Sequence, residues 1–202
     1  MEQSAKQTQK AAYHHGDLRA HLIETVRLLV EEKGADGFSI SEAARRAGVS
    51  SAAPYKHFED RREIVRAVAL LGIKRMRQQM DDAAAAATGD RLAPITALGL
   101  CYARFARTEP GVFRLIFGLT EGRDEDSEMH ALGTACEDVV KREVRRVMPE
   151  GTDEEEIARR AYMLHMFVHG HAFLEIDGVH DNEISGDVEH ALMADIAARV
   201  MA

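Results

Sequence analysis

The sequence predicts an all-α protein of about nine helices, divided between a small N-terminal part and a larger C-terminal part. Apolar residues recur at spacings of three and four along most of the 202 residues, and strict alternation is nearly absent. With 46% hydrophobic and 30% charged residues, the composition is that of a folded globular chain. No apolar run approaches the roughly 18 residues of a membrane-spanning helix, so we expect no membrane partner.

The first helix is predicted from an apolar stripe that begins directly after Asp17 and stops near Gly34. Asp17 suits the N-cap position, and glycine commonly ends a helix because it tolerates the left-handed conformation. The members of the stripe are Leu18, Leu22, Val26, Leu29 and Val30.

Two short helices are predicted next. The first is capped by Ser39 or Ser41, and the second is capped by Ser50 or Ser51 and ends near Phe58. Serine suits both positions because its hydroxyl accepts a hydrogen bond from a free backbone N–H of the first turn.

The rest of the chain predicts six further helices. Turns at Thr88–Asp90, Glu109–Gly111 and Pro149–Asp153 separate some of them, and loops at 121–128 and 177–186 separate the others. The alanine run 83–87 has high helix propensity and is assigned to the end of the first of these helices. The expected ranges are 60–87, 91–108, 112–119, 129–148, 153–176 and 187–201.

Charge is distributed unevenly along the chain. Residues 1–80 hold 14 Lys and Arg against 10 Asp and Glu, whereas residues 81–202 hold 12 against 24. Binding to phosphate needs only a local positive potential, so the net charge of −8 does not exclude a nucleic-acid partner. A chance scatter of surface charge is the alternative.

The two cysteines, Cys101 and Cys136, are expected to be reduced thiols of a cytoplasmic protein, since the N-terminus carries no export signal.

The segment 38–58, FSISEAARRAGVSSAAPYKHF, has the features of a helix-turn-helix. Small residues at Ala43, Ala44 and Ala47 allow a second helix to cross closely. Gly48 takes the left-handed conformation of a sharp turn without steric cost. The free N–H groups at the start of the following helix then face outward, where phosphates or base edges can accept from them.

This segment and the charged stretch Glu59–Ile64 resemble the DNA-binding domain of the TetR/AcrR family of bacterial transcriptional regulators. The shared pattern is a helix of small residues, then Ala-Gly-Val-Ser, then Tyr-x-His-Phe and a charged helix start, within Asp17–Arg66. Outside it, Tyr13–Leu18, Glu109–Gly118 and the pair His169-Gly170 resemble the branch of the family with a WHG-type C-terminal ligand-binding domain.

The resemblance implies the organisation of the whole chain. Residues 1–16 are expected to form a flexible arm, and residues 17–60 a three-helix DNA-binding domain with the helix-turn-helix. Residues 61–202 are expected to form a helical ligand-binding and dimerisation domain, in which 61–87 is the connecting helix.

The resemblance also places a recognition helix on Ser51–His57. Lys56 and Arg61 would reach phosphates, and the alanines at the helix start would contact thymine methyl groups. Many relatives carry a larger apolar residue where Pro54 stands; proline fits if Ser51 is the cap and strains the turn if Ser50 is. The expected DNA-binding residues are Ser39, Ser41, Ser51, Ala52, Ala53, Tyr55, Lys56, His57 and Arg61.

A pocket for a small hydrophobic effector of unknown identity is implied in the C-terminal part. Apolar, adaptable side chains suit such a ligand, although by periodicity alone these residues are core. The expected lining residues are Cys101, Tyr102, Phe105, Phe113, Phe117, Met163, Met166, Phe167 and His169.

Three histidines, His165, His169 and His171, lie close together in the sequence, and Glu175 follows four residues after His171. His165 and His169 are four residues apart, a spacing that places two imidazoles on one helix face. Two interpretations follow: a metal site, or hydrogen-bonded histidines at a pocket rim or dimer interface, which can respond to pH. No His-Glu-x-x-His run and no nearby cysteine supports the metal, so we predict neither a metal nor a cofactor.

Dimerisation is expected through the last two helices, as the resemblance implies. Two helix-turn-helix segments about 34 Å apart would read successive major grooves of a palindromic double-stranded operator. The apolar stripes assigned to this interface are Ile157, Ala161, Leu164, Val168 and Ala172, with Leu192, Ile196 and Val200.

The sequence therefore predicts a homodimeric, ligand-responsive transcriptional repressor that is not an enzyme. It contains no Gly-x-Ser-x-Gly elbow and no phosphate-binding glycine-rich loop. An all-helical enzyme and a protein-interaction adaptor without DNA binding are the alternatives, and activation of transcription is not excluded.

Overall fold

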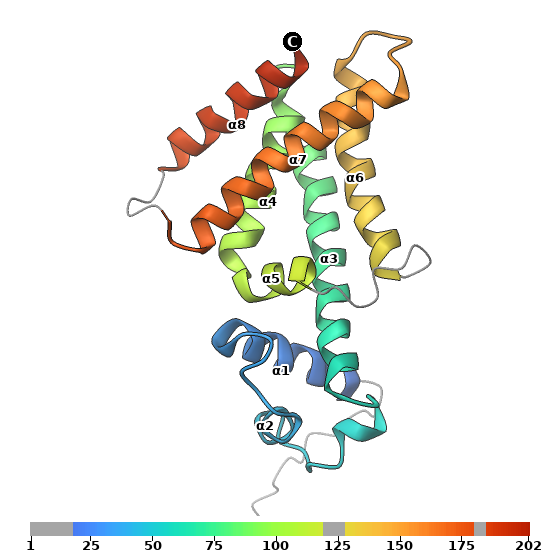
Figure 1. Ribbon diagram of the computed structural model, residues 1–202, viewed down its shortest axis with the longest axis vertical. Helices are drawn as coiled ribbons and strands as arrows, with labels where there is room; N and C mark the ends of the chain where they lie inside the picture. The colour runs from blue at the N-terminus through green and yellow to red at the C-terminus, as the bar shows by residue number, and fades with distance from the viewer. Residues whose placement is uncertain (1–17, 119–127, 180–184) are drawn as a thin grey trace, which may run out of the picture. The chain divides into compact units, whose positions relative to one another are not determined.

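The computed structural model describes residues 18–118, 128–179 and 185–202 (Figure 1). In these ranges the chain forms eight α-helices, one 3₁₀ turn and no strand, so the all-α prediction is confirmed. The predicted N-terminal arm and the Asp17 cap lie outside the described residues, as does most of the predicted loop at 121–128. The elements are α1 (Leu18–Lys33), α2 (Ile40–Arg46), the 3₁₀ turn η1 (Pro54–Lys56), α3 (Arg61–Ala86), α4 (Ala93–Thr108), α5 (Pro110–Gly118), α6 (Glu128–Val147), α7 (Glu154–Ile176) and α8 (Gly186–Met201).

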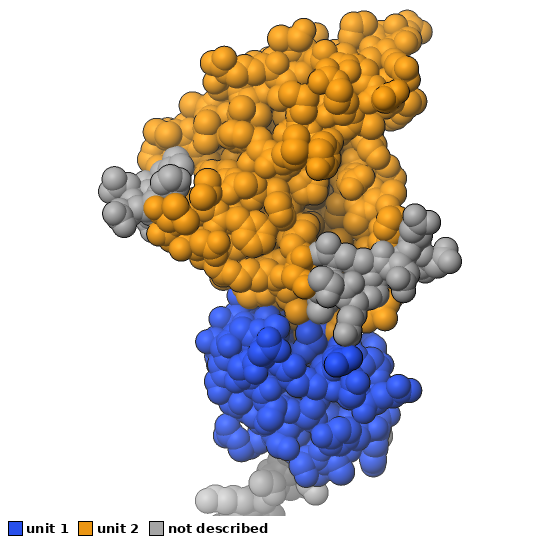
Figure 2. Space-filling model, viewed as in Figure 1, with its two compact units in different colours: residues 1–65 blue, residues 66–202 orange. Residues whose placement is uncertain are grey.

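The chain divides into two compact units, Met1–Val65 and Arg66–Ala202 (Figure 2). The division falls within α3, whose first turn belongs to the N-terminal unit and whose remainder belongs to the C-terminal unit. None of the helices in the described ranges combines the length and hydropathy that crossing a membrane requires.

In the N-terminal unit, α1 buries its apolar stripe against α2 and its neighbours. The hydroxyl of Ser39 accepts a hydrogen bond from the backbone N–H of Glu42 at 3.1 Å and so caps α2. The helix ends before Gly48, which has a φ of 72° as the sharp turn requires. Ion pairs from Lys33 to Glu42 and from Arg46 to Glu32 join the two helices on their exposed side.

The C-terminal unit is built around α4, which packs against α5, α6, α7 and α8. In Figure 1, α7 crosses in front of α4, with α6 on one side and α8 on the other. Phe105 of α4 and Phe113 of α5 are the largest fully buried side chains of the described residues. The alanine-rich end of α3 is helical to Ala86, as predicted.

Helix α5 packs very closely on α3 at Gly72. A Cβ atom at this glycine would lie 2.4 Å from Cγ1 of Val112 and 3.2 Å from Cδ1 of Ile116. Both α5 side chains are buried. The two helix backbones can approach this closely only because residue 72 has no side chain.

The predicted third helix of the N-terminal unit is shorter than expected. Instead of an α-helix capped by Ser50 or Ser51, the structure has turns followed by the 3₁₀ turn η1, with no side-chain cap. An α-helix capped by Ser50 would need residue 54 to donate to the carbonyl of Ser50, and Pro54 has no N–H. That carbonyl accepts from the N–H of Ala53 instead, at 3.0 Å.

The apolar stripe of α7 that was predicted to lie in the dimer interface is buried within the single chain. The assignment of these five residues to a dimer interface is therefore wrong. All five members of the stripe are at most 9% exposed, because they face α4, α6 and α8. The exposed apolar residues of α7 lie elsewhere around the helix, at Tyr162, Met163, Met166 and Leu174.

We expect the substitution Gly72→Ala to destabilise the fold by about 1–3 kcal/mol, since the new methyl group must push α5 away from α3. Gly133→Ala in α6 is the matched control, because a Cβ there meets no atom within 4 Å. That change should leave stability unchanged or raise it by up to about 1 kcal/mol through helix propensity. Urea unfolding of the two variants measures the difference, and equal stabilities would contradict the close contact.

Candidate functional site

The helix-turn-helix presents an exposed surface made of the residues between Gly48 and His57. Tyr55 is 59% exposed, and Ser51, Ala52 and Lys56 are also exposed. Ala53 and His57 are half-buried, and Ser41 is exposed on α2. The structure thus brings most of the predicted DNA-binding residues to the surface.

Two of the predicted DNA-binding side chains have partners inside the unit. The hydroxyl of Ser39 caps α2. The guanidinium of Arg61 donates to the carbonyls of Ala35 and Phe38 and lies 4.7 Å from the centre of the Phe38 ring. Arg61 therefore joins the start of α3 to the loop before α2, a structural role that the sequence pattern does not reveal.

Two buried residues, Pro54 and Phe58, fix the exposed turn to the core of the N-terminal unit. Pro54 and Phe58 are buried, and the backbone N–H of Phe58 donates to the carbonyl of Pro54 at 3.0 Å. The guanidinium of Arg19 lies 5.0 Å from the centre of the Phe58 ring. The exposed residues Tyr55 and Lys56 thus lie between two residues that are fixed in the core of the unit.

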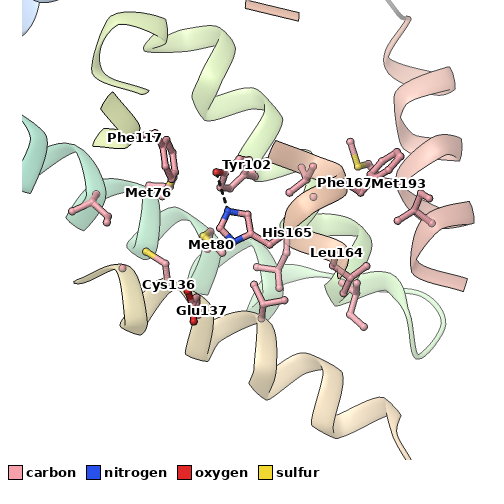
Figure 3. Close-up of a pocket in the computed structure, with 18 residues that line it drawn as sticks. Met76, Met80, Tyr102, Phe117, Cys136, Glu137, Leu164, His165, Phe167 and Met193 are labelled. Atoms are coloured by element: carbon pink, nitrogen blue, oxygen red, sulfur yellow. Dashed lines mark hydrogen bonds between the residues drawn. The ribbon is translucent and has the colours of Figure 1, made fainter. Parts of the chain in front are cut away.

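The C-terminal unit contains a partly open cavity of about 180 Å³ lined by helices α3, α4, α6, α7 and α8, with Phe117 from α5 (Figure 3). This is far more than the roughly 15 Å³ that one water molecule needs. Its walls are mostly apolar: Ile73, Met76, Met80, Ile95, Leu98, Gly99, Tyr102, Phe117, Gly133, Cys136, Glu137, Val140, Leu164, His165, Phe167, Val168, Met193 and Ile196.

Polar atoms of the cavity gather around Tyr102. Its hydroxyl lies 2.8 Å from Nδ1 of His169 and 3.5 Å from Nε2 of His165, and Figure 3 shows Tyr102 and His165 side by side. Burial lowers the pKa of His165, and burial followed by the neighbouring His165 lowers the pKa of His169. Both imidazoles are therefore neutral at pH 7 and can donate or accept one hydrogen bond at each nitrogen according to tautomer.

Burial also keeps two other polar groups of the cavity protonated. It raises the pKa of the Tyr102 hydroxyl, and it raises the pKa of the Cys136 thiol to about 11. A thiol in this state is a poor nucleophile, because the thiolate is the reactive form.

Three of the nine predicted pocket residues, Tyr102, Phe117 and Phe167, line the cavity. His169 does not line the cavity, but its Nδ1 is hydrogen-bonded to the hydroxyl of Tyr102. The other five do not line it: Cys101, Phe105 and Phe113 are buried in the core, and Met163 and Met166 are exposed on α7.

Sequence reasoning missed the walls that α3, α6 and α8 provide. Apolar residues of the connecting helix recur at spacings of three to five residues, at Ile64, Val68, Leu71 and Met76. Nothing in the spacing of Met76 distinguishes a cavity wall from ordinary core. The same holds for Cys136 on α6 and Met193 on α8.

We expect the folded state to lose stability as the pH falls from 7 to 5, partly through His165. Burial holds the pKa of His165 below its ordinary value in the folded chain, so the unfolded chain binds the proton first and acid favours unfolding. Each such histidine contributes at most about 1.4 kcal/mol per pH unit. Urea unfolding at a series of pH values should show a smaller acid loss for His165→Asn than for the wild type. His190→Asn, at an exposed position of α8, should keep the wild-type slope; the wild-type slope in His165→Asn would contradict a neutral buried imidazole.

Two family models match the chain. The model described as bacterial regulatory proteins, tetR family, matches residues 22–68, and the tetracyclin repressor-like C-terminal domain matches residues 95–198. The second match alone covers more than half of the chain. No curated protein matches the sequence.

Solved structures share the fold over nearly the whole chain. A protein of unknown function from Rhodococcus sp. RHA1 is 29% identical, with a TM-score of 0.80 over 94% of this chain and 98% of that chain. A TetR-family transcriptional regulator from Streptomyces coelicolor is 17% identical, with a TM-score of 0.67 over 92% and 95%. One from Thermus thermophilus is 18% identical, with a TM-score of 0.60 over 89% and 96%. Together with the two family models, these matches show that the chain belongs to the TetR family of transcriptional regulators.

Proposed function

We propose that this protein is a ligand-responsive transcriptional repressor that binds a palindromic operator as a homodimer and is released by a small hydrophobic effector. The observation that carries the proposal concerns α3. Ile73, Met76 and Met80 of this helix line the cavity, and its first turn, Arg61–Val65, belongs to the helix-turn-helix unit. One helix thus belongs both to the wall of a ligand-sized cavity and to the DNA-binding unit.

The DNA-contacting surface is the exposed turn that follows Gly48. Lys56 supplies a positive charge for a phosphate, and the phenol of Tyr55 can donate a hydrogen bond to the backbone. Ser51 and Ala52 are small enough to let the chain approach base edges closely. The further contacts proposed are Ser41, which is exposed, and Ala53 and His57, which are half-buried on the same unit.

A second copy of the chain accounts for the exposed apolar face of α7. At about 100° per residue, Tyr162, Met163, Met166 and Leu174 fall within one sector of the helix. Met166 is 52% exposed and Tyr162 is 64% exposed, which is unusual for a helix whose other side is in the core. Pairing this face with its copy would bury it and supply the second helix-turn-helix that a palindrome requires.

The cavity indicates the chemical class of the effector. Nearly all of its wall is apolar, and its few polar groups include the hydroxyl of Tyr102 and the neutral imidazole of His165. An occupant would therefore be an apolar molecule with one hydrogen-bonding group placed at Tyr102 and His165. An anionic molecule would lose its hydration without a compensating positive charge among these residues, whereas Glu137 supplies a carboxylate that could pair with a cation.

Release would follow from the contact between α5 and α3. Phe117 of α5 lines the cavity, and Val112 and Ile116 of the same helix press on Gly72. An effector that moves Phe117 must shift α5, and the close contact at Gly72 leaves α3 no room to stay in place. A 100-fold change in operator affinity requires about 2.7 kcal/mol of differential effector binding, which a small apolar ligand can supply.

We expect Lys56→Ala to weaken binding to a palindromic operator, selected from a random oligonucleotide pool, without changing the preferred sequence. Loss of one phosphate contact should make the slope of log affinity against log salt shallower by about 1. Arg91→Ala removes an exposed positive charge from the C-terminal unit and should bind as the wild type does. Fluorescence anisotropy over a salt series measures both. Failure of the wild type to select any DNA would overturn the proposed function.

We expect Val140→Phe, which fills the cavity from α6, to abolish the response to effector while leaving operator binding intact. Effectors are identified first, as apolar compounds that raise the melting temperature of the wild type and release it from the operator. Val188→Phe adds the same bulk at an exposed position of α8 and should keep the wild-type response. An effector that releases Val140→Phe and the wild type equally would show that it binds elsewhere.

A further inference from the structure

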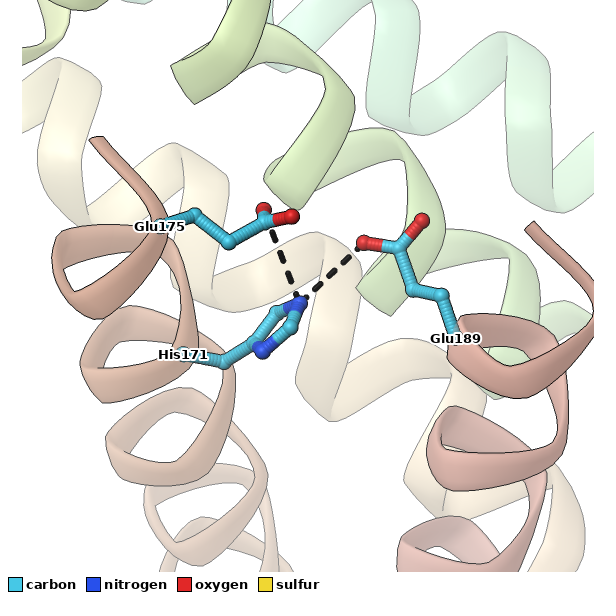
Figure 4. Close-up of side chains that lie close together, drawn as sticks. All are labelled: His171, Glu175 and Glu189. Carbon is cyan, nitrogen blue, oxygen red and sulfur yellow. Dashed lines mark hydrogen bonds and ion pairs between the residues drawn. The ribbon is translucent and has the colours of Figure 1, made fainter. Parts of the chain in front are cut away.

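Four ionisable side chains from three helices meet away from the cavity, where α7 ends and α8 begins. His171 and Glu175 lie one turn apart on α7, Glu189 is in the first turn of α8, and Arg107 is in the last turn of α4. Figure 4 shows the imidazole of His171 directed at both carboxylates. His171 and Glu189 are buried and Glu175 is half-buried, so helix packing holds the ligand atoms in place.

The three potential ligand atoms have the spacing of a metal site. Nε2 of His171 lies 3.1 Å from Oε1 of Glu189 and 3.6 Å from Oε2 of Glu175, and all three atoms lie within 4.8 Å of one another. Two ligands of a tetrahedral Zn²⁺ ion, each about 2.1 Å from the metal, lie about 3.4 Å apart. The side chains would need only small rotations to coordinate one ion.

A cation already lies between the two carboxylates. Nη1 of Arg107 is 2.9 Å from Glu175 Oε2 and 2.5 Å from Glu189 Oε1. The arginine side chain is 40% exposed, so it can turn into water and keep its charge hydrated. Arg107 balances one of the two negative charges, whereas a divalent cation would balance both.

We propose that His171, Glu175 and Glu189 bind a divalent first-row transition metal of the Zn²⁺ class in exchange for the Arg107 guanidinium. The imidazole nitrogen favours Zn²⁺ or Co²⁺ over Mg²⁺ and Ca²⁺, which prefer oxygen ligands throughout. Water would complete the coordination. Because the ligands come from α7 and α8, the bound ion cross-links these two helices.

The test is metal titration of the metal-free full-length protein, followed by Co²⁺ visible absorption and by the shift in melting temperature that Zn²⁺ produces. The wild type should bind one Co²⁺ at a site with the intense absorption of tetrahedral coordination, and Zn²⁺ should raise its melting temperature. His171→Ala and Glu175→Gln each remove one ligand and should lower Co²⁺ affinity at least tenfold. His190→Ala removes an exposed histidine of α8 outside the cluster and should bind as the wild type does.

The variant Arg107→Gln distinguishes exchange of the guanidinium for a metal ion from non-specific metal binding to surface histidines. Without the competing guanidinium, Co²⁺ affinity should rise at least several-fold, and the melting shift with Zn²⁺ should exceed that of the wild type. If Arg107→Gln is unstable without metal, restoration of folding by Zn²⁺ is the expected result. Absence of binding by the wild type, equal affinity in His171→Ala and Glu175→Gln, or an unchanged or smaller metal response in Arg107→Gln would each overturn the proposal.

Discussion

Helix α5 packs closely on Gly72 of α3, and this contact limits how the C-terminal unit can rearrange. A Cβ atom at residue 72 would overlap the side chain of Val112, so the two helices cannot move closer together at this point. The same two helices supply walls of the cavity, through Phe117 on one and Met76 on the other. A ligand that changes the shape of the cavity therefore acts on both partners of this contact.

Buried polar side chains are few in the described part of the C-terminal unit, and they have hydrogen-bond partners. Tyr102 satisfies His165 and His169 at the cavity, and Arg107 compensates Glu189 at the junction of α7 and α8. Burial raises the pKa of Glu189, but hydrogen bonds from Arg107 and His171 outweigh that effect and the pKa lies below its ordinary value. No buried side-chain nitrogen or oxygen in the described residues lacks a hydrogen-bond partner. These clusters are thus the places where a ligand or an ion could exchange partners with the protein.

Periodicity and caps predicted most of the helices within a few residues of their bounds, because these signals act locally. Periodicity and caps did not predict features that depend on contacts between residues far apart in the sequence. Pro54 removes the hydrogen bond that a helix capped by Ser50 requires, and only the structure shows that the chain forms a 3₁₀ turn here. The stripe from Ile157 to Ala172 indicated a buried face but not whether its own chain or a second copy buries it. Glu189 lies too far along the sequence for any spacing rule to join it to His171.

The most direct test of the account is the distance between the two helix-turn-helix units of a dimer, measured by pulsed electron paramagnetic resonance between spin labels at Glu59→Cys. The native thiols of Cys101 and Cys136 are buried and their pKa values are raised by that burial, so they react slowly with the label. With operator bound, we expect a single distance set by recognition segments about 34 Å apart, and a different distance when effector is bound. A distance that effector leaves unchanged while it releases the DNA would contradict transmission through α5 and α3.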